Sequence, residues 1–344
     1  MDDSTARCPM TTAGGGMARW KCLAHASEAG TSQVSTHLRY TAGSNHKLET
    51  GMSPRDLLLA LVVVVAWGVN FVVIKVGLHG VPPMLLGALR FTLAAVPAVF
   101  FVKRPKLAWR WLFAYGATIS FGQFAFLFSA MYVGMPAGLA SLVLQAQAFF
   151  TLIFAALFLR ERFRLPNVAG LLIAAAGLAV IGLQGGHAMT LAGFVLTLCA
   201  ACSWALGNIV TKKVGNVDLV GLVVWGSLIP PVPFFAASYV FEGPQKIAAA
   251  LSGISAMSIF AVVYLAFIAT LIGYGLWSRL LSRYPASQVA PFSLLVPIVG
   301  LASASLLLGE QLSVAQIGGA LLVMAGLVVN VFGGRVVQRF MPAR

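Results

Sequence analysis

The segment PAGLASLVLQAQAFFTLIFAALFLRERF at residues 136–163 has a counterpart in PASQVAPFSLLVPIVGLASASLLLGEQL at residues 285–312. Both begin with Pro-Ala, continue as an apolar stretch, and place a glutamate near the end, Glu161 in one and Glu310 in the other. The same offset of 149 residues relates YGATIS at 115–120 to YLAFIA at 264–269, and AAGLAV at 175–180 to MAGLVV at 324–329. An ungapped match over nearly seventy residues indicates an internal duplication.

The composition requires a membrane as the solvent of this chain. Of its 344 residues 59% are hydrophobic and only 9% are charged, with a mean hydropathy of +0.90. Soluble domains carry roughly 25% charged residues, so this chain cannot cover a surface that faces water. Its net charge of +14 does not indicate nucleic-acid binding, because the basic residues form short clusters between apolar stretches, as in cytoplasmic loops that face anionic headgroups.

The apolar stretches predict ten membrane-spanning helices. A helix needs about 20 apolar residues to cross the hydrocarbon core of a bilayer. The predicted spans are 57–76, 84–102, 110–131, 137–159, 167–184, 191–210, 218–241, 257–277, 287–308 and 315–333.

Each half of the duplication contains five of these spans, with residues 52–184 as the first repeat and 191–335 as the second. Because five is odd, the second repeat enters the membrane with the opposite orientation. The predicted fold is therefore an all-α integral membrane protein of ten transmembrane helices in two inverted repeats, with a substrate site between them near the midplane. Residues 336–344 are expected to form a cytoplasmic tail.

Residues 1–51 differ in composition from the rest of the chain. They are rich in Ser, Thr, Gly and Ala, and they lack the apolar core of a signal peptide. Met52 begins MSPRDLLLALVVVV, a short charged segment that runs directly into a span. We expect the first 51 residues to be a disordered tail or to precede the natural start.

Lys and Arg are distributed very unevenly between the two sides of the membrane. With the N-terminus in the cytoplasm, 20 of the 23 lie inside and one, Lys246, lies outside. The other two, Lys75 and Arg90, lie within or at the ends of spans. Since cytoplasmic loops carry the excess of positive charge, both termini are predicted to be cytoplasmic.

Three stretches resemble the EamA family of the drug/metabolite transporter superfamily. They are WGVNFVVIKVGLHGVPPMLLGALRF (67–91), FGQFAFLFSAMYVGMPAGLASLVLQAQAFF (121–150) and VAPFSLLVPIVGLASASLLLGEQL (289–312). The resemblance extends from Met52 to about Arg335. It implies a ten-helix exporter of amino-acid metabolites such as cysteine and O-acetylserine in the cell inner membrane. We expect a monomer or a homodimer.

The charges that approach the membrane interior are positive. Arg90 lies about two turns inside its predicted span, where an unpaired cation is costly, and no acidic residue is placed to neutralise it. Arg90, together with Lys75, is therefore a candidate for binding the carboxylate of an anionic or zwitterionic substrate. Alternatively, Arg90 binds backbone carbonyl groups and Lys75 extends to the outer interface.

Uncharged polar and aromatic residues within the spans complete the candidate substrate site. On the fourth helix Ser141 and Gln145 share one face, whereas Gln147 is expected to point elsewhere. Hydrogen bonds between helices would explain each candidate equally well. Pro291 and Pro297 are expected to interrupt the ninth span. The candidates are Asn70, Lys75, Arg90, Gln123, Ser141, Gln145, Asn208, Tyr264, Tyr274 and Trp277.

Several classes of protein are disfavoured by what the spans contain. None of the nine acidic residues and none of the five histidines lies deep in a span, which disfavours an intramembrane protease or a metalloenzyme. Cys199 and Cys202 have a C-x-x-C spacing but no partner ligands, so we interpret them as packing residues. The absence of a nucleotide-binding motif predicts secondary transport, without cofactor or metal, driven by protons or by exchange. A broader drug or metabolite exporter, a membrane enzyme and a channel are the alternatives.

Overall fold

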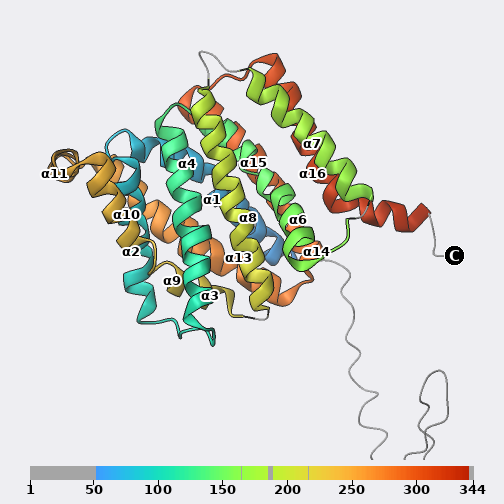
Figure 1. The fold of residues 1–344 in the computed structure, drawn as a ribbon, viewed down its shortest axis with the longest axis horizontal. Coiled ribbons are helices and arrows are strands. Elements are labelled where there is room, and N and C mark those ends of the chain that lie inside the picture. The colour runs from blue at the N-terminus through green and yellow to red at the C-terminus, as the bar shows by residue number, and fades with distance from the viewer. Residues whose placement is uncertain (1–51, 164, 185–188, 216, 341–344) are drawn as a thin grey trace, which may run out of the picture. The chain divides into compact units, whose positions relative to one another are not determined.

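The computed structural model describes residues 52–163, 165–184, 189–215 and 217–340, which form helices joined by short turns (Figure 1). The expectation of a disordered segment or late start concerns residues 1–51, which lie outside the described part, as do residues 341–344 of the expected tail. The last helix continues to Phe340, five residues beyond the expected end of the second repeat.

The described chain contains sixteen α-helices and four helical segments of other types. Before residue 190 these are α1 (Pro54–Leu78), α2 (Pro83–Val99), α3 (Trp109–Tyr115), the π-helical η1 (Gly116–Gly122), α4 (Gln123–Tyr132), α5 (Ala137–Val143), α6 (Ala146–Leu159) and α7 (Leu165–Leu183). After residue 190 they are α8 (Leu191–Val214), α9 (Leu219–Gly226), α10 (Pro231–Ala237), the π-helical η2 (Ser238–Glu242), α11 (Pro244–Ser252), α12 (Ala256–Val263), the π-helical η3 (Tyr264–Ile272), α13 (Gly273–Arg283), α14 (Ala286–Val289), the 3₁₀-helical η4 (Ala290–Leu294), α15 (Leu295–Leu308) and α16 (Val314–Phe340).

Nine continuous helical stretches of the described chain are long and apolar enough to cross a membrane, and each coincides with a predicted span to within a few residues. The remaining predicted span, 84–102, is the second along the chain and corresponds to a shorter helix. Helix α2 contains Pro97 and ends at Val99 after 17 residues. A proline inside a helix removes one backbone hydrogen bond and crowds the preceding turn. The expectation of ten full-length spans is therefore not confirmed.

Irregularities of the backbone recur at the offset of the sequence duplication. The π-helical segment η1 has its counterpart in η3, and the turn at Leu144 and Gln145 has its counterpart in η4. Arg160 ends α6 in the left-handed conformation with φ 56°, and Gly309, 149 positions later, ends α15 with φ 67°. The two halves of the sequence therefore share backbone detail as well as apolar spans.

Helices α7 and α16 pack along each other over most of their length and form a pair at the right-hand edge of Figure 1. A Cβ atom added to Gly170 would lie 2.6 Å from the carbonyl oxygen of Gly326, and one added to Gly177 would lie 2.6 Å from that of Gly319. Small residues allow such close approach of helix backbones in membranes. The offset of 149 relates Gly170 to Gly319 and Gly177 to Gly326, so each contact is the counterpart of the other.

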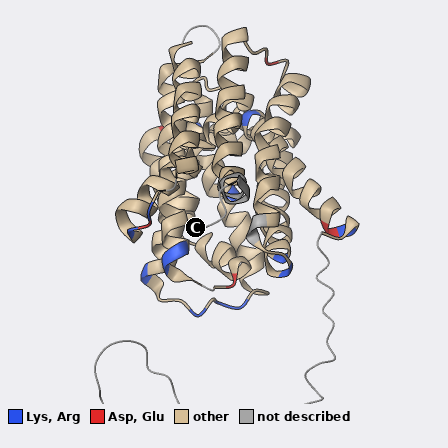
Figure 2. Cartoon of the chain, turned by 90° about the vertical axis from the view of Figure 1, so that its right-hand side faces the viewer, with Lys and Arg blue, Asp and Glu red and all other residues tan. Residues whose placement is uncertain are grey.

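The remaining helices interleave elements from both halves of the sequence. Helix α1 packs along α15 and α5, while α8 packs along α6 and α4. Lys and Arg gather at the lower end of the bundle in Figure 2, and the helices between its two ends are almost entirely free of charged residues. This distribution is the one expected of helices embedded in lipid.

Candidate substrate-binding site

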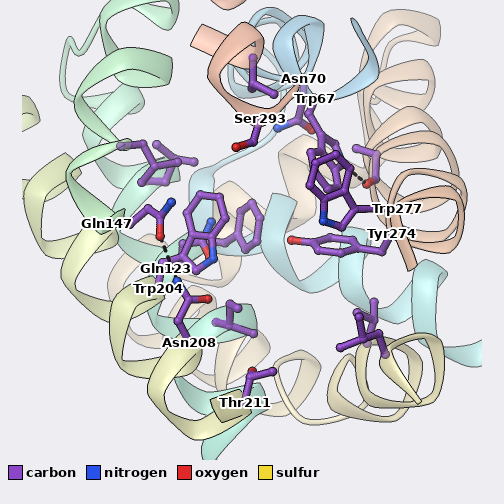
Figure 3. Close-up of a pocket in the computed structure, with 18 of the residues that line it drawn as sticks. Trp67, Asn70, Gln123, Gln147, Trp204, Asn208, Thr211, Tyr274, Trp277 and Ser293 are labelled. Carbon is purple, nitrogen blue, oxygen red and sulfur yellow. Dashed lines mark hydrogen bonds between the residues drawn. The ribbon is translucent and has the colours of Figure 1, made fainter. Parts of the chain in front are cut away.

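A cavity of about 360 Å³ lies within the helix bundle. Its lining comes from α1, α2, α3, η1, α4, α5 and α6 of the first half and from α8, α9, η3, α13, η4 and α15 of the second (Figure 3). Ligand pockets of proteins typically measure 300–1,000 Å³ and combine apolar walls with a few polar groups. The cavity has this character, since aromatic and aliphatic side chains surround a small number of buried polar ones.

Arg90 reaches this cavity from the middle of α2 and is only 2% exposed. Its guanidinium carbon lies 3.9 Å from the ring centroid of Phe124, and Nη2 donates to the hydroxyl of Thr270 at 3.1 Å. Within the described residues Nε and Nη1 have no hydrogen-bond partner, and no ion pair involves Arg90. The site therefore contains a buried positive charge for which the described residues provide no negatively charged partner.

Two further side chains of the cavity lining carry buried oxygen atoms without a donor. These are Asn70 Oδ1 on α1 and Gln123 Oε1 on α4, from residues that are 8% and 2% exposed. More than 90% of buried polar groups in folded proteins have a hydrogen-bond partner. Unpaired donors and unpaired acceptors thus occur around the same cavity.

Aromatic rings form one wall of the cavity. The ring of Trp67 lies 5.2 Å from that of Tyr274 and 5.3 Å from that of Trp277, measured between centroids. The indole nitrogen of Trp67 donates to the carbonyl oxygen of Ala269 at 3.0 Å, which fixes the ring between α1 and η3. Trp204 of α8 adds a further ring to the lining (Figure 3).

Gln147 also lines the cavity, contrary to the expectation that it points elsewhere. Its side-chain oxygen accepts a hydrogen bond of 2.9 Å from Asn208, whose amide lies 3.1 Å from the hydroxyl of Thr151. The expectation assumed one continuous helix, but the chain turns at Leu144 and Gln145 before α6 begins. That turn changes the helical register, so Gln147 faces the interior together with Gln145.

Eight of the ten candidate residues line this single cavity, and two do not. Lys75 donates to the carbonyl oxygen of Met131 at 3.0 Å. The hydroxyl of Tyr264 donates to the carbonyl oxygen of Ala66 at 2.9 Å. Both side chains lie outside the lining. Sequence reasoning missed several lining residues, although the recurrence of Trp67 and Asn70 as Trp204 and Asn208 was a usable signal. The lining candidates are Asn70, Arg90, Gln123, Ser141, Gln145, Asn208, Tyr274 and Trp277, and the missed ones include Trp67, Gln147, Trp204, Thr211 and Ser293.

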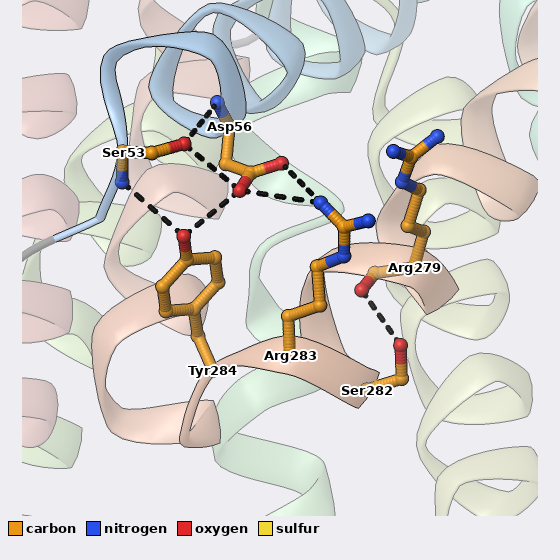
Figure 4. A network of polar contacts seen from close by, with 6 residues as sticks. All are labelled: Ser53, Asp56, Arg279, Ser282, Arg283 and Tyr284. Carbon is orange, nitrogen blue, oxygen red and sulfur yellow. Dashed lines mark hydrogen bonds and ion pairs between the residues drawn. The ribbon is translucent and has the colours of Figure 1, made fainter. Parts of the chain in front are cut away.

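A polar network lies beside the cavity at the end where α1 begins. Asp56 accepts hydrogen bonds from Ser53, from the Tyr284 hydroxyl at 2.8 Å and from Arg283 at 3.2 Å (Figure 4). The carboxylate is buried although Arg283 is half exposed. Because α1 and α13 belong to different halves of the sequence, this network joins the halves at that end.

Carboxylates join segments of different halves at the opposite end. Glu310 accepts hydrogen bonds from the backbone N–H groups of Ala137 and Gly138, at 2.7 and 2.9 Å, where α5 begins. Glu242 accepts two in the same way at the start of α2, at 2.6 and 3.1 Å. A carboxylate at a helix N-terminus pairs with free N–H groups and with the positive end of the helix dipole.

No metal centre accompanies the cavity in the described residues, where no three His, Cys, Asp or Glu side chains gather. Cys199 and Cys202 are free, partly exposed thiols on α8. The groups available to a ligand are therefore the guanidinium of Arg90, side-chain amides, hydroxyls and aromatic faces. They can bind and orient a small polar molecule.

Comparison with known proteins places the chain in a family. The model of the EamA-like transporter family matches residues 55–183 and, separately, residues 191–332. A protein of Salmonella typhimurium named probable amino-acid metabolite efflux pump is 55% identical over 292 residues, which cover 83% of this chain and 97% of that protein. Its namesake in Escherichia coli is 54% identical over 291 residues with the same shares of 83% and 97%.

A solved crystal structure supports the fold, with a TM-score of 0.56 over 83% of this chain and 100% of its own at 19% identity. The two family matches together cover most of the chain, and each of the two relatives is identical to it at more than half of the aligned positions, over nearly the relative's whole length. This chain belongs to the EamA-like transporter family and is a multi-pass membrane transporter, not an enzyme.

Proposed function

We propose that this protein is a secondary active transporter that exports amino-acid metabolites, cysteine and O-acetylserine among them, across the inner membrane. The observation that carries the proposal is Arg90, a buried cation on the wall of a cavity, for which the described residues provide no counter-ion. A substrate carboxylate would supply the missing charge and two hydrogen-bond acceptors. The names of the Salmonella and Escherichia relatives support the class of substrate.

The proposed architecture is ten transmembrane helices in two inverted repeats, with residues 52–184 and 191–335 as the repeats and α2 as the short second helix. The two family matches, the recurrent backbone irregularities and the reciprocal glycine contacts of α7 and α16 support it. Two halves of opposite orientation can rock about a shared site, which gives alternating access.

We further propose that both termini are cytoplasmic and that the described arrangement receives substrate from the cytoplasm. Thr211, Leu219 and Leu281 extend the cavity toward the end at which α1 begins. The carboxylate contacts of Glu310 and Glu242 hold segments together at the opposite end. Export would require these contacts to open while the first end closes, driven by the proton gradient or by exchange.

Broader specificity within the same class is the second candidate. A cavity of about 360 Å³ with Trp67, Trp204, Tyr274 and Trp277 in its lining can accommodate side chains larger than that of cysteine. In this case bulky amino acids would inhibit efflux of labelled O-acetylserine, and their potency would rise with the apolar area of their side chains. An exporter of narrow specificity would not be inhibited by them.

Efflux from cells tests the proposal directly. Cells that express the wild-type chain should release labelled cysteine or O-acetylserine faster than cells without it, and Arg90→Ala should abolish the difference. Lys103→Ala removes an exposed positive charge outside the cavity and should leave efflux unchanged at equal membrane abundance. Equal release with and without the wild-type chain would refute the substrates, and normal efflux by Arg90→Ala would refute the role of the arginine.

A further inference from the structure

The unpaired polar atoms of this protein are concentrated at one place. Among the described residues, five buried side-chain nitrogen or oxygen atoms have no hydrogen-bond partner, and four of them belong to cavity-lining residues. Those four are Arg90 Nε and Nη1, Asn70 Oδ1 and Gln123 Oε1; the fifth is Thr92 Oγ1, outside the lining. Unpaired buried groups are rare because each forfeits its hydrogen bond to water. Such a concentration points to a ligand that provides the missing partners.

The chemistry of the four atoms specifies that ligand. Arg90 offers N–H donors with a full positive charge, which match the two oxygen atoms of a carboxylate. Asn70 and Gln123 offer carbonyl oxygens, which are acceptors and match a donor group with several hydrogens, such as an ammonium. A molecule that carries both groups on the same carbon atom is an α-amino acid in its zwitterionic form. An anion alone would pair Arg90 but leave both carbonyl oxygens without donors.

The placement of the three residues agrees with one shared headgroup site. Arg90 of α2 lies over the ring of Phe124, the residue that follows Gln123 on α4. Asn70 lies on α1 one turn after Trp67, and both Asn70 and Gln123 line the same cavity as Arg90 (Figure 3). The aromatic wall of Trp67, Tyr274 and Trp277 then remains for the side chain of the ligand.

We infer that Arg90, Asn70 and Gln123 form a binding site for the α-carboxylate and α-ammonium of a free amino acid, so that this transporter selects zwitterions over simple anions. The inference rests on the proposed function and adds the requirement for a free amino group. Polar sites built to pair a donor discriminate strongly against analogues that lack it, because their own buried groups stay unpaired. Modification of the amino group should therefore abolish recognition even when the carboxylate is intact.

O-acetylserine and N-acetylserine make a matched pair of probes. They are isomers of the same size, but O-acetylserine keeps its ammonium whereas N-acetylserine carries only the carboxylate. The experiment is counterflow of labelled O-acetylserine in proteoliposomes that contain the full chain, with each unlabelled isomer as competitor. A mildly acidic buffer suppresses migration of the acetyl group between the two positions. We expect N-acetylserine to compete at least about tenfold more weakly than O-acetylserine.

Variants assign the discrimination to the proposed atoms. Gln123→Met and Asn70→Leu keep the approximate size of each side chain but remove its carbonyl oxygen, and they should reduce the preference for O-acetylserine over N-acetylserine. Thr92→Val removes the unpaired oxygen that lies outside the lining, and it should keep the wild-type preference. A lost preference in Gln123→Met or Asn70→Leu with intact binding of N-acetylserine also excludes misfolding as the cause.

The possible failures are distinguishable. Absence of O-acetylserine counterflow by the wild-type chain would refute the proposed substrate itself. Counterflow of O-acetylserine with equal competition by N-acetylserine would leave the proposed function standing and overturn the zwitterion site. A wild-type preference that survives both Gln123→Met and Asn70→Leu would overturn the assignment to these two residues.

Discussion

At the scale of single residues, the behaviour of this transporter depends on an arginine in an unusual setting. Arg90 is almost fully buried, yet the described protein gives its guanidinium one hydroxyl acceptor and the face of Phe124. A charge at membrane depth is costly without a partner. Its planar, delocalised guanidinium tolerates stacking on an aromatic ring, and its Nε and Nη1 have no acceptor among the described residues.

Replacement of this arginine by lysine tests whether geometry or charge alone matters. Arg90→Lys keeps the positive charge but loses the forked donors and the stacking on Phe124. We expect KM for O-acetylserine in counterflow to rise by about tenfold or more, with Thr270→Val giving a smaller rise because the guanidinium remains. An unchanged KM in Arg90→Lys would show that a point charge suffices and that the proposed bidentate contact is absent.

The residues of the cavity were largely predictable because polar groups within apolar spans are costly unless they face the protein interior. That rule alone selected Asn70, Gln123 and Asn208, among others. It failed to place Lys75 and Tyr264, which direct their polar ends to backbone carbonyl oxygens of Met131 and Ala66. Which carbonyl group lies within reach is decided by tertiary packing and is not encoded in the local pattern.

At the scale of helices, irregular segments determine which residues face the cavity. Pro291 made the interruption of the ninth span predictable, and η4 lies there, whereas Pro297 lies in the first turn of α15 and does not interrupt it. The equivalent turn at Leu144 and Gln145 contains no proline, so nothing in the local sequence announced it. Because of this turn, Gln147 joins the cavity, which a continuous helix would not allow. The duplication was the remaining signal, since an interruption in one repeat predicts one in the other.

Close packing of α7 against α16 should be sensitive to a single methyl group. A Cβ atom at Gly319 would lie 2.7 Å from Ile181 and 2.8 Å from the carbonyl oxygen of Gly177, whereas one at Gly318 meets nothing within 4 Å. We expect Gly319→Ala to lower Tm in detergent by roughly 2–6 °C. Gly318→Ala on the same helix should be neutral or slightly stabilising, because alanine favours helix over glycine. Equal shifts in the two variants would contradict the described contact.

The contact of Glu310 with the start of α5 should act as a closure between the halves. Glu310→Gln loses the charge, and its single carbonyl oxygen cannot replace both carboxylate contacts. We therefore expect a longer distance between spin labels at Tyr132 and Val314, two exposed positions on α4 and α16. The measurement is electron–electron double resonance in a chain whose four native cysteines are replaced.

The sequence counterpart of Glu310 provides the control for that experiment. Glu161 is half exposed and pairs with Lys212 at 2.9 Å, and it belongs to the other end of the bundle. Glu161→Gln should leave the distance between Tyr132 and Val314 as in the wild type. Closure by Glu310 would be contradicted if Glu310→Gln had no effect, or if both variants lengthened the distance equally.

At the scale of the whole molecule, duplication and charge together predict the orientation. A repeat unit of five helices implies that the two halves cross the membrane in opposite directions. The basic residues gather at one end of the bundle (Figure 2). We expect a single cysteine at Lys246 to react with a membrane-impermeant thiol reagent in intact cells. A cysteine at Lys106 should react only after the cells are opened, and the reverse pattern would overturn the proposed topology.

The proposed function requires saturable exchange of an amino-acid metabolite through the cavity. Proteoliposomes that contain the full chain and are loaded with unlabelled O-acetylserine should transiently accumulate labelled O-acetylserine from outside. This accumulation should saturate with concentration and disappear in Arg90→Ala. Accumulation that is absent in the wild type, or that persists unchanged in Arg90→Ala, would contradict transport through the Arg90 site.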